Sequence, residues 1–379
     1  MNQSGERRIV LSAPGFPVSD ADHDKPFLLN HAKALSAAGF HVTVVCPALP
    51  NLAGRQTVEG IEVIRVRYAP RRVETLAATG SMYEEAKGIR FLLAFPMLVS
   101  MIYATIRELR AGAAIAYGHW WVPGGLVAVI AGWCCRRPSV VHLHGSDVAI
   151  AANKFTRQLA RWVLRRATVR LAVSEELAQW GCRLSSRSVR VLPMPLAFGP
   201  LSQPSPAPEN GFLLAVGRLV PEKGFSVLIA AIALMGLDER PDLVIVGTGP
   251  EREKLLAQAA RSKVSLRLPG AVAPNELLSW YQRARIVAVP SLREGFGLVA
   301  AEAAAAGRVV VGSAVGGISD VVNHGSSGML VKPGNSEELA LALQSVDPQW
   351  GANGPEQVAH LGMTSHAQIL KRLFDGLPN

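Results

Sequence analysis

Short apolar runs alternate with stretches of helical periodicity along the first half of the chain. The apolar runs predict strands at 8–14, 41–47, 61–68, 113–119, 139–145, 169–174 and 189–193. Between them, apolar residues recur at helical spacing and predict helices over 25–40, around 86–110, from about 124, and over 154–166. This alternation is typical of a parallel sheet covered by helices.

A proline-rich stretch interrupts the alternation. The segment 193–210 holds five Pro between positions 193 and 206 and almost no charge, so we expect a linker there. Strands are then predicted at 212–217, 242–247, 264–270, 285–291 and 309–313, and helices at 224–236, 250–261, 274–283 and 297–306. Two consecutive α/β domains are therefore expected, and in such sheets ligands bind beyond the carboxyl ends of the strands.

The composition of the 379 residues fits this organisation. Because 49% of the residues are hydrophobic, wholesale disorder is excluded. No CxxC or His-paired spacing indicates a zinc site, so we interpret the cysteines as buried free thiols in a reducing compartment. These cysteines are Cys46, Cys134, Cys135 and Cys182. The first residues lack the pattern of a secretory signal, which favours a cytoplasmic protein.

Charge is unevenly distributed between the two halves. Residues 1–200 hold 24 Lys and Arg against 13 Asp and Glu, a net charge of +11, whereas residues 201–379 hold 15 against 16, a net charge of −1. A basic half suits an anionic lipid surface or a phosphorylated substrate, and it also fits a solvated Arg-rich surface. Nucleic acid is disfavoured because the charge is diffuse and no basic-aromatic motif occurs.

One uncharged run, 91–106, requires comparison with a membrane span. It has 16 residues and is interrupted by Pro96, whereas a spanning helix needs about 20. A buried or interfacial helix is therefore expected. Further along, Arg157, Arg161 and Arg165 recur every four residues and form a basic stripe on one helix face.

Three segments of the second half carry candidate chemistry. GRLVPEKG (217–224) places two cations, Arg218 and Lys223, between a strand and a helix, where a diphosphate can bind. GTGP (247–250) resembles part of a dinucleotide fingerprint but also fits a tight strand-to-helix turn. REGFGLVAAEAAAAG (293–307) carries Glu294 before a glycine turn and Glu302 inside an Ala-rich helix, where a carboxylate can bind ribose hydroxyls or be solvent-exposed.

Two segments of the first half carry weaker signals. HLHGSD (142–147) ends a strand, so His144 and Asp147 are expected to face the cleft between the two domains. The His-x-His spacing with a nearby Asp also fits a metal site. DADHD (20–24) contains Asp20, Asp22 and Asp24, which resemble an Asp-x-Asp metal signature. Because this loop follows the first strand, an acidic loop is the favoured interpretation.

Taken together, these segments resemble glycosyltransferase family 4. The resemblance rests on GRLVPEKG, VIVGTGPEREKL, RLPGAVAPNELLSWY, VPSLREGFGLVAAEAAAAG and VVGSAVGGISDVV, in that order, with Glu294 and Glu302 as an E-x7-E pair. GHWWVPGG (118–125) and HGSD match the family's first domain more loosely. The resemblance implies the GT-B fold, with two Rossmann-like domains facing each other across a cleft. The acceptor-binding domain would span 1–195 and the donor-binding domain 210–363. The terminal helix, about 364–379, would return to the first domain.

The resemblance also implies roles for individual residues. Arg218 and Lys223 would hold the donor diphosphate without a metal, Glu294 and His144 would contact the sugar, and these four would be catalytic. Nucleotide and sugar contacts are implied for a second set, in which Glu302 would bind the ribose and Val272 the base. This donor-binding set is Gly15, Gly217, Gly247, Val272, Gly295, Phe296, Gly297, Leu298 and Glu302. The family generally retains anomeric configuration.

These features lead to one main functional hypothesis. We expect a retaining, metal-independent hexosyltransferase that uses a UDP- or GDP-sugar and acts on a lipid-linked or envelope glycan acceptor. Such an enzyme would lie at the inner face of the cell membrane. A nucleotide-sugar epimerase or hydrolase of the same fold, a glycogen- or sucrose-type enzyme, and a non-catalytic sugar-nucleotide-binding subunit remain as alternatives. The chain departs from the family in its first loop, where Gly15 stands alone, and in PMPLA (193–197), where Asn-Gly-x-Asp is usual.

Overall fold

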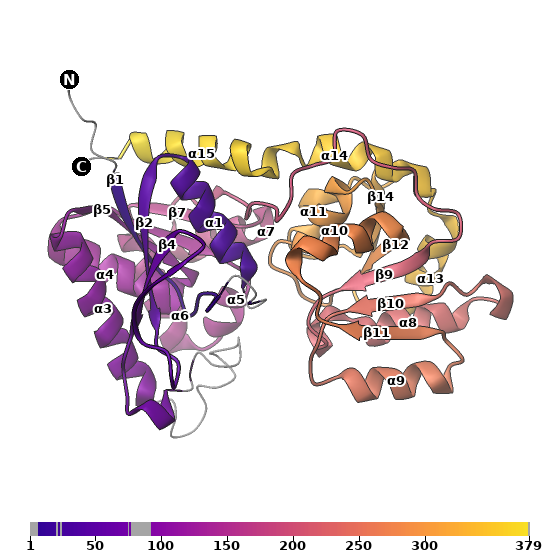
Figure 1. The fold of residues 1–379 in the computed structure, drawn as a ribbon, viewed down its shortest axis with the longest axis horizontal. Coiled ribbons are helices and arrows are strands. Elements are labelled where there is room, and N and C mark those ends of the chain that lie inside the picture. Colours follow the sequence, from indigo (N-terminus) through magenta and orange to yellow (C-terminus); the bar gives the residue numbers. More distant parts are fainter. Residues whose placement is uncertain (1–6, 20–21, 23–24, 75, 77–91, 378–379) are drawn as a thin grey trace. The chain divides into compact units, whose positions relative to one another are not determined.

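The computed structural model describes residues 7–19, 22, 25–74, 76 and 92–377 (Figure 1). The chain divides into two compact units, one formed by Met1–Pro195 with His366–Asn379 and the other by Leu196–Ser365. Each unit is built on a mainly parallel sheet covered by helices, which is the predicted α/β class. We refer to them as unit 1 and unit 2.

The sheet of unit 1 has the strand order β3-β4-β2-β1-β5-β6-β7-β8. Its pairs are parallel except for β3 with β4, and β3 is a short antiparallel strand that the hydrophobic pattern did not predict. The strands are β1 (Arg7–Ser12), β2 (Phe40–Pro47), β3 (Gly54–Val58), β4 (Ile61–Val66), β5 (Ala113–His119), β6 (Ser139–Leu143), β7 (Val169–Ala172) and β8 (Arg190–Val191). The chain order reverses between β1 and β5, which places a topological switch point there.

Helices cover both faces of this sheet. On one face, α3 (Ala94–Arg110) and α4 (Leu126–Cys135) pack on Val10, Val45 and Ala116, and α4 also contacts α6 (Lys154–Arg166). On the other face lie α1 (Pro26–Ala37) and the terminal helix α15 (Met363–Asp375). The helices α5 (Ser146–Ile150) and α7 (Glu175–Ser185) complete the unit. The expected helix around 86–110 is described only from its later part, because residues 86–91 lie outside the described residues.

The terminal helix α15 packs on the sheet of unit 1. Phe374 is fully buried and its ring lies 5.8 Å from that of Phe40 and 5.9 Å from that of Tyr117. Arg7 donates to the carbonyl oxygens of Phe374 and Leu377 at 2.7 and 3.0 Å. The last helix of the chain therefore completes the core of the first unit.

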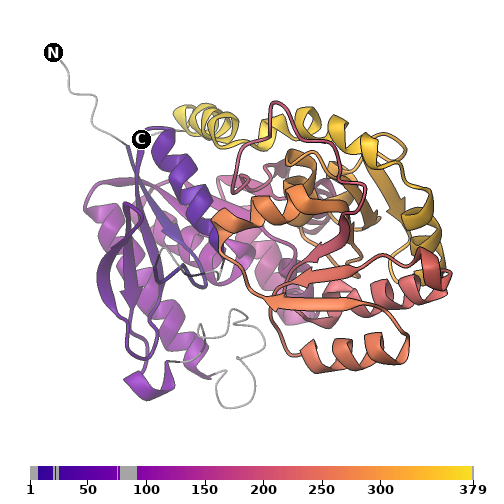
Figure 2. The same ribbon diagram turned by 45° about the vertical axis from the view of Figure 1, so that its right-hand side comes forward.

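Unit 2 has a six-stranded sheet of order β11-β10-β9-β12-β13-β14, with every recorded pair parallel. Its strands are β9 (Phe212–Val216), β10 (Leu243–Val246), β11 (Leu266–Gly270), β12 (Ala284–Val289), β13 (Val309–Ser313) and β14 (Gly328–Val331). Its helices are α8 (Phe225–Leu234), α9 (Arg252–Arg261), α10 (Pro274–Arg283), α11 (Leu298–Ala305), α12 (Ile318–Val321), α13 (Ser336–Ser345) and α14 (Gly354–Gln357). The helices α8, α9 and α13 share one core with the sheet (Figures 1 and 2). The switch point lies between β9 and β12.

The proline-rich segment after position 195 packs on unit 2. Leu201 N–H donates to Ala305 O at 2.9 Å, and the buried Arg308 donates to Ser205 O at 2.6 Å. From Leu196 onward the chain therefore belongs to unit 2, and the stretch expected to be a linker forms part of a domain surface.

The structure corrects the expectation that all four cysteines are buried. Cys46 is buried in β2, but Cys134 is exposed near the end of α4. The apolar run around Cys134 belongs to a helix with one solvent-facing side, and Trp133 beside it is 76% exposed.

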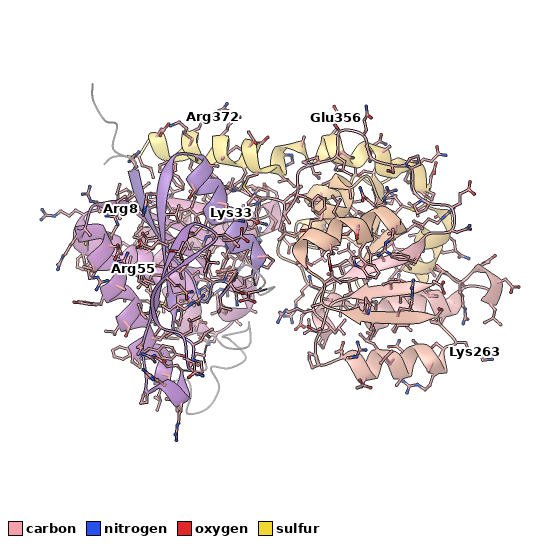
Figure 3. All side chains as sticks on the ribbon, viewed as in Figure 1. Arg8, Lys33, Arg55, Lys263, Glu356 and Arg372 are labelled. Atoms are coloured by element: carbon pink, nitrogen blue, oxygen red, sulfur yellow. The ribbon has the colours of Figure 1, made fainter. Side chains whose placement is uncertain are left out.

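Basic side chains are prominent on unit 1, where Figure 3 labels Arg8, Lys33 and Arg55. Arg55 and Arg8 approach the buried Glu108 carboxylate at 2.7 and 3.5 Å. These pairs neutralise Glu108, so part of the basic character is structural rather than available to a partner.

Candidate active site

The switch point of unit 2 brings together two residues that lie 71 positions apart. Lys223 follows β9, Glu294 follows β12, and Lys223 Nζ donates to Glu294 Oε2 at 2.6 Å. Ser291 Oγ donates to the same oxygen at 3.1 Å. Both members of the pair are partly exposed. Both residues were predicted from the sequence to belong to the site, and in the structure they are direct partners at the carboxyl ends of adjacent strands.

The loop after β9 carries the second predicted cation. Arg218 is exposed, and the loop is held by Leu219 N–H, which donates to Thr248 O at 2.8 Å. Glu222 O accepts from Leu292 N–H at 2.8 Å, which ties this loop to the one that carries Glu294. Two cations therefore stand on a backbone that is fixed from both sides.

The glycines of two predicted donor-binding turns act through close packing. A Cβ on Gly247 would lie 1.9 Å from Gly217 O, so only glycine allows the two turns to touch. The N–H groups of Gly217 and Gly247 donate to Val246 O and Gly270 O at 2.9 and 2.8 Å. Because these N–H groups extend the sheet, they are not available as phosphate donors, and the turn interpretation of GTGP is the one that the structure supports.

A third glycine turn leads into α11. Gly297 has φ of +88°, and a Cβ there would lie 2.8 Å from Ile318 Cγ1. Phe296 is buried, so of this residue the backbone rather than the ring can meet a ligand, and Leu298 begins the helix. The first N–H groups of a helix have no intrahelical acceptor and favour anions. Gly295 N–H donates to Glu294 Oε1 at 3.2 Å, so the turn offers an anion the N–H groups at the start of α11, beside the Lys223–Glu294 pair.

Glu302 lies one helical turn further along α11 and is 8% exposed. Tyr281 of α10 donates its hydroxyl hydrogen to Glu302 Oε2 at 2.8 Å. Burial raises the pKa of Glu302 to about 7, and the hydrogen bond from Tyr281 partly opposes that shift. Ribose hydroxyls would add donors to the carboxylate and favour its anionic form.

Val272, the residue expected near the base, is half-buried just beyond the end of β11. Because β11, β10, β9 and β12 are successive neighbours, Val272, Gly247, Lys223 and Glu294 follow one another along a single edge of the sheet. These residues therefore lie at the carboxyl end of the sheet, where ligands bind in such folds.

In unit 1, the loop after β1 holds Gly15 beside the Lys25 side chain, whose Nζ would lie 3.3 Å from an added Cβ. The buried Arg65 donates to Phe16 O and Pro17 O at 2.9 and 2.7 Å and fixes this loop. Asp22 Oδ2 accepts from Val18 N–H at 2.8 Å, as in a tight turn. Asp20 and Asp24, the other residues of the Asp-x-Asp pattern, lie outside the described residues.

His144 follows β6 and is half-buried. Its Nε2 lies 2.7 Å from His119 Nδ1, and the Trp120 ring centroid is 4.5 Å from its own. Burial and the neighbouring His142 lower the pKa of His144 well below its usual value, so the ring is neutral at physiological pH. A neutral imidazole can donate or accept a hydrogen bond to a sugar hydroxyl.

Asp147 does not face outward as the sequence suggested. It is fully buried, and its carboxylate accepts from the backbone N–H groups of Trp121 and His144 at 2.7 and 2.6 Å. Burial raises its pKa to about 6, although these hydrogen bonds favour the anion. Asp147 therefore shapes the loops that carry His144.

Several residues around Glu302 in unit 2 and around His144 in unit 1 were not identified from the sequence. Tyr281 ends the motif RLPGAVAPNELLSWY, yet nothing in its spacing indicated a hydrogen bond to Glu302. His31 and His366, which join the His144 neighbourhood, lie on helices far apart in the chain. Sequence spacing holds no signal for that contact.

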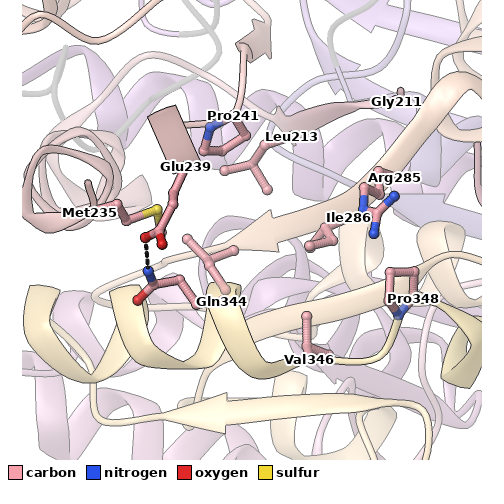
Figure 4. A pocket seen from close by; sticks show the side chains of 11 residues that line it. Gly211, Leu213, Met235, Glu239, Pro241, Arg285, Ile286, Gln344, Val346 and Pro348 are labelled. Atoms are coloured by element: carbon pink, nitrogen blue, oxygen red, sulfur yellow. Dashed lines mark hydrogen bonds between the residues drawn. The ribbon is translucent and has the colours of Figure 1, made fainter. Parts of the chain in front are cut away.

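A cavity of about 330 Å³ lies elsewhere in unit 2 (Figure 4). It is lined by Leu213, Ile286 and Leu343, near the amino ends of β9 and β12, and Glu239 accepts from Gln344 there at 2.8 Å. This is the end of the sheet opposite to the Lys223–Glu294 pair, so the cavity is separate from the candidate active site.

Two family models match the chain. The model described as "Glycosyl transferase 4-like domain" matches residues 26–197, and "Glycosyl transferases group 1" matches residues 201–347. The matched ranges correspond closely to the two units.

Individual relatives span most of the chain. A glycogen synthase of Mycobacterium tuberculosis is 29% identical over 83% of this chain and 79% of its own length. A D-inositol 3-phosphate glycosyltransferase of Corynebacterium jeikeium is 28% identical over 97% and 94%. The putative teichuronic acid biosynthesis glycosyltransferase TuaC of Bacillus subtilis is 25% identical over 89% and 88%.

Solved structures share the fold over nearly the full length. A sucrose-phosphate synthase from Thermosynechococcus elongatus superposes with a TM-score of 0.77 at 22% identity, covering 97% of this chain and 98% of the other. Anabaena HepE in complex with UDP gives a TM-score of 0.73 at 19% identity, covering 98% and 100%.

Proposed function

Because the chain belongs to glycosyltransferase family 4 and has the GT-B fold, we propose that it is a retaining, metal-independent hexosyltransferase. Its donor would be a UDP- or GDP-sugar and its acceptor a lipid-linked or envelope glycan. The observation that carries this proposal is the Lys223–Glu294 pair at the switch point of unit 2, beside the backbone donors of the Gly295–Leu298 turn.

The arrangement of unit 2 suits a sugar diphosphate. Lys223 and Arg218 supply two positive charges, and the start of α11 supplies N–H groups for phosphate oxygens. When the diphosphate takes Lys223 Nζ, Glu294 would be released to accept hydrogen bonds from sugar hydroxyls. The HepE complexes with UDP and UDP-glucose support a nucleotide sugar as the donor class.

The transfer would break the bond between the anomeric carbon and the diphosphate oxygen, and form one from that carbon to an acceptor oxygen. Negative charge builds on the departing diphosphate, where fixed cations stabilise it most. The proton of the acceptor hydroxyl would go to the diphosphate. Retention requires both bonds on the same face of the sugar, and cations held beside the leaving group fit that requirement.

The outer surface of unit 1 supports a membrane-associated acceptor. The helix α3 buries Met97 and Met101, but its opposite side exposes Phe95 (74%), Val99 and Tyr103. In the neighbouring helices α4 and α6, Trp133 and Phe155 (78% exposed) are also solvent-facing.

Basic residues accompany these apolar side chains. Arg157 and Arg165 of α6 are exposed and Arg161 is half-buried, while Arg107 and Arg110 end α3. Aromatic and basic side chains on adjacent helices are typical of proteins that bind the interface of an anionic membrane. No helix among the described residues is long and apolar enough to cross a bilayer.

The decisive experiment is a donor panel with the purified chain. Release of the nucleoside diphosphate and NMR of the product's anomeric centre would be measured with a polyprenyl-diphosphate glycan as acceptor. Transfer with retained configuration, unchanged after EDTA, is the expected result. An inverted product or a requirement for Mg²⁺ would contradict the proposal, and release that does not depend on the acceptor would favour a hydrolase.

A further inference from the structure

Five histidines gather on one face of the unit 1 sheet. In paired parallel strands, His119 of β5 lies beside His142 of β6, and residues two apart on a strand share a face. Tyr117 and His144 therefore project to the same side. The helices α1 and α15, which cover this face, add His31 and His366, whose rings lie 5.3 Å apart (Figure 1).

The hydrogen bonds of this cluster leave one ring nitrogen of His119 unused. His119 Nδ1 lies 2.7 Å from His144 Nε2, but among the described residues its buried Nε2 has no partner. His142 is fully paired, with Nε2 at 2.8 Å from Leu192 O and Nδ1 at 2.7 Å from the Tyr117 hydroxyl. His31 Nε2 is likewise without a partner among the described residues, so two buried ring nitrogens of the cluster have unused hydrogen-bonding capacity.

We propose that His119, His142 and His144 form an inhibitory binding site for Zn²⁺ or a related transition-metal ion. Each offers one ring nitrogen, and the three nitrogens lie within 4.8 Å of one another. Nitrogens bound to one tetrahedral zinc are about 3.3 Å apart, given bonds of roughly 2.0–2.1 Å. The three rings would have to rotate to bring their nitrogens to that separation.

The tautomer of His142 is already suited to a metal. Leu192 O can only accept, so His142 Nε2 carries the hydrogen and Nδ1 keeps its lone pair. A backbone carbonyl that holds the far N–H is a common outer partner of a metal-binding histidine. On metal binding, the Tyr117 hydroxyl turns away from Nδ1.

The bond between His119 and His144 must also open. Its shared hydrogen moves to the other nitrogen of whichever ring donates it, and for His119 that atom is the unused Nε2. Asp147 supplies no ligand because its carboxylate holds two backbone N–H groups. Three nitrogens without a carboxylate favour Zn²⁺, Co²⁺ or Ni²⁺ over Mg²⁺ or Mn²⁺.

Inhibition follows from the place of His144, and this part rests on the proposed function. A bound ion would hold His144 Nε2 and place a divalent charge beside the donor sugar, which needs neutral hydrogen bonds there. The ion would bind no atom of Arg218 or Lys223, the two cations proposed to hold the diphosphate. The enzyme would therefore need no metal, yet be inhibited by zinc and restored by EDTA.

Binding is tested with Co²⁺ alone, without donor or acceptor, on the EDTA-stripped full chain. We expect a visible d–d absorption that saturates at one Co²⁺ per chain, at least ten-fold weaker binding in His119→Gln and His144→Gln, and normal binding in His41→Gln, an exposed control. Absence of a saturable band, or equal affinity in all variants, would overturn the site. Because His144 is only half-buried, His144→Gln carries the test if His119→Gln does not fold.

Inhibition is tested separately in the transfer assay. Zn²⁺, but not Mg²⁺, should reduce turnover over the range in which Co²⁺ binds, and EDTA should restore it. Stoichiometric Co²⁺ binding without inhibition would overturn the inhibitory role. A chain that binds Co²⁺ but transfers no sugar from any donor would instead refute the proposed function.

Discussion

The carboxyl ends of the two sheets carry opposite kinds of polar groups. In unit 2 the groups are charged and partly exposed, as in the pair Lys223–Glu294. In unit 1 they are neutral, buried rings around His144, together with Asp147, which is used by backbone N–H groups. A departing diphosphate needs fixed charge, whereas a sugar needs hydrogen bonds without strong charge. The same sheet architecture therefore supplies electrostatics in one unit and neutral hydrogen bonding in the other.

The largest effect is expected when unit 2 loses a cation. Lys223→Ala or Arg218→Ala should reduce turnover roughly 100- to 1,000-fold, because each removes a preorganised contact to the charge that builds on the leaving group. Arg293→Ala is the matched control, since Arg293 lies on the Glu294 loop but pairs with Glu222 at 2.9 Å. Steady-state turnover measures the effect. Near-normal rates in both variants would contradict the claim that the charged groups of unit 2 stabilise the leaving diphosphate.

The pH dependence of the unfolding free energy should distinguish the buried Glu302 from the exposed carboxylates. Its pKa is about 7 in the folded chain against 4.5 as the reference, so the folded state binds the proton more tightly. The resulting stabilisation is complete below pH 4.5 and is lost as pH rises towards 7, a change of about 3 kcal/mol in unfolding free energy.

Glu302→Gln should flatten that part of the pH profile while still accepting from Tyr281. Urea unfolding at pH 4.5, 6 and 8 measures the difference, with the exposed Glu276→Gln as control. The variant should be stabilised relative to the native chain at pH 8, and should bind a nucleotide more weakly. Parallel profiles for the native chain and Glu302→Gln would show that Glu302 is not buried as described.

The two units differ in how far sequence could define them. The candidate active site of unit 2 consists of contiguous motifs that follow strands, so the βα alternation of the sequence alone predicts that Lys223 and Glu294 lie at one sheet edge. The cluster in unit 1 joins β5, β6, α1 and α15, and its contacts depend on tertiary packing. His144 was identified because it lies in a motif that follows a strand. His119 and His366 were not identified, because only tertiary packing brings them to His144. Exposure is equally a tertiary property, which explains the error at Cys134.

A carboxylate in unit 1 should affect stability rather than chemistry. Asp147→Ala leaves the N–H groups of Trp121 and His144 without their acceptor, at a cost of about 1–3 kcal/mol in unfolding free energy. Asp238→Ala, an exposed control in unit 2, should change stability little. Denaturant midpoints provide the measurement. If Asp147→Ala keeps native stability but loses turnover, Asp147 belongs to the chemistry instead.

The smallest effect concerns the surface of unit 1. Arg157→Gln should weaken binding to anionic vesicles by about 1 kcal/mol, roughly five-fold, at low salt. Arg372→Gln on α15, which covers the other face of the sheet, should have less effect (Figure 3). Vesicle co-sedimentation measures both. Binding should also fall as salt shortens the screening length from about 10 Å at 0.1 M to about 3 Å at 1 M. Failure of the protein to bind anionic vesicles at low salt would indicate a water-soluble acceptor.

The placement of α15 has a consequence for how the protein is made. Domains usually fold in order as the ribosome releases them, the amino-terminal one first. Here the core of the first domain is incomplete without Phe374. The ring of Phe374 packs against Phe40 and Tyr117, and its carbonyl oxygen accepts a hydrogen bond from Arg7. Unit 1 can therefore reach its final packing only after the residues up to Phe374 have been synthesised. A chain that stops before α15 would leave the apolar surface around Phe40 and Tyr117 exposed to chaperones and proteases.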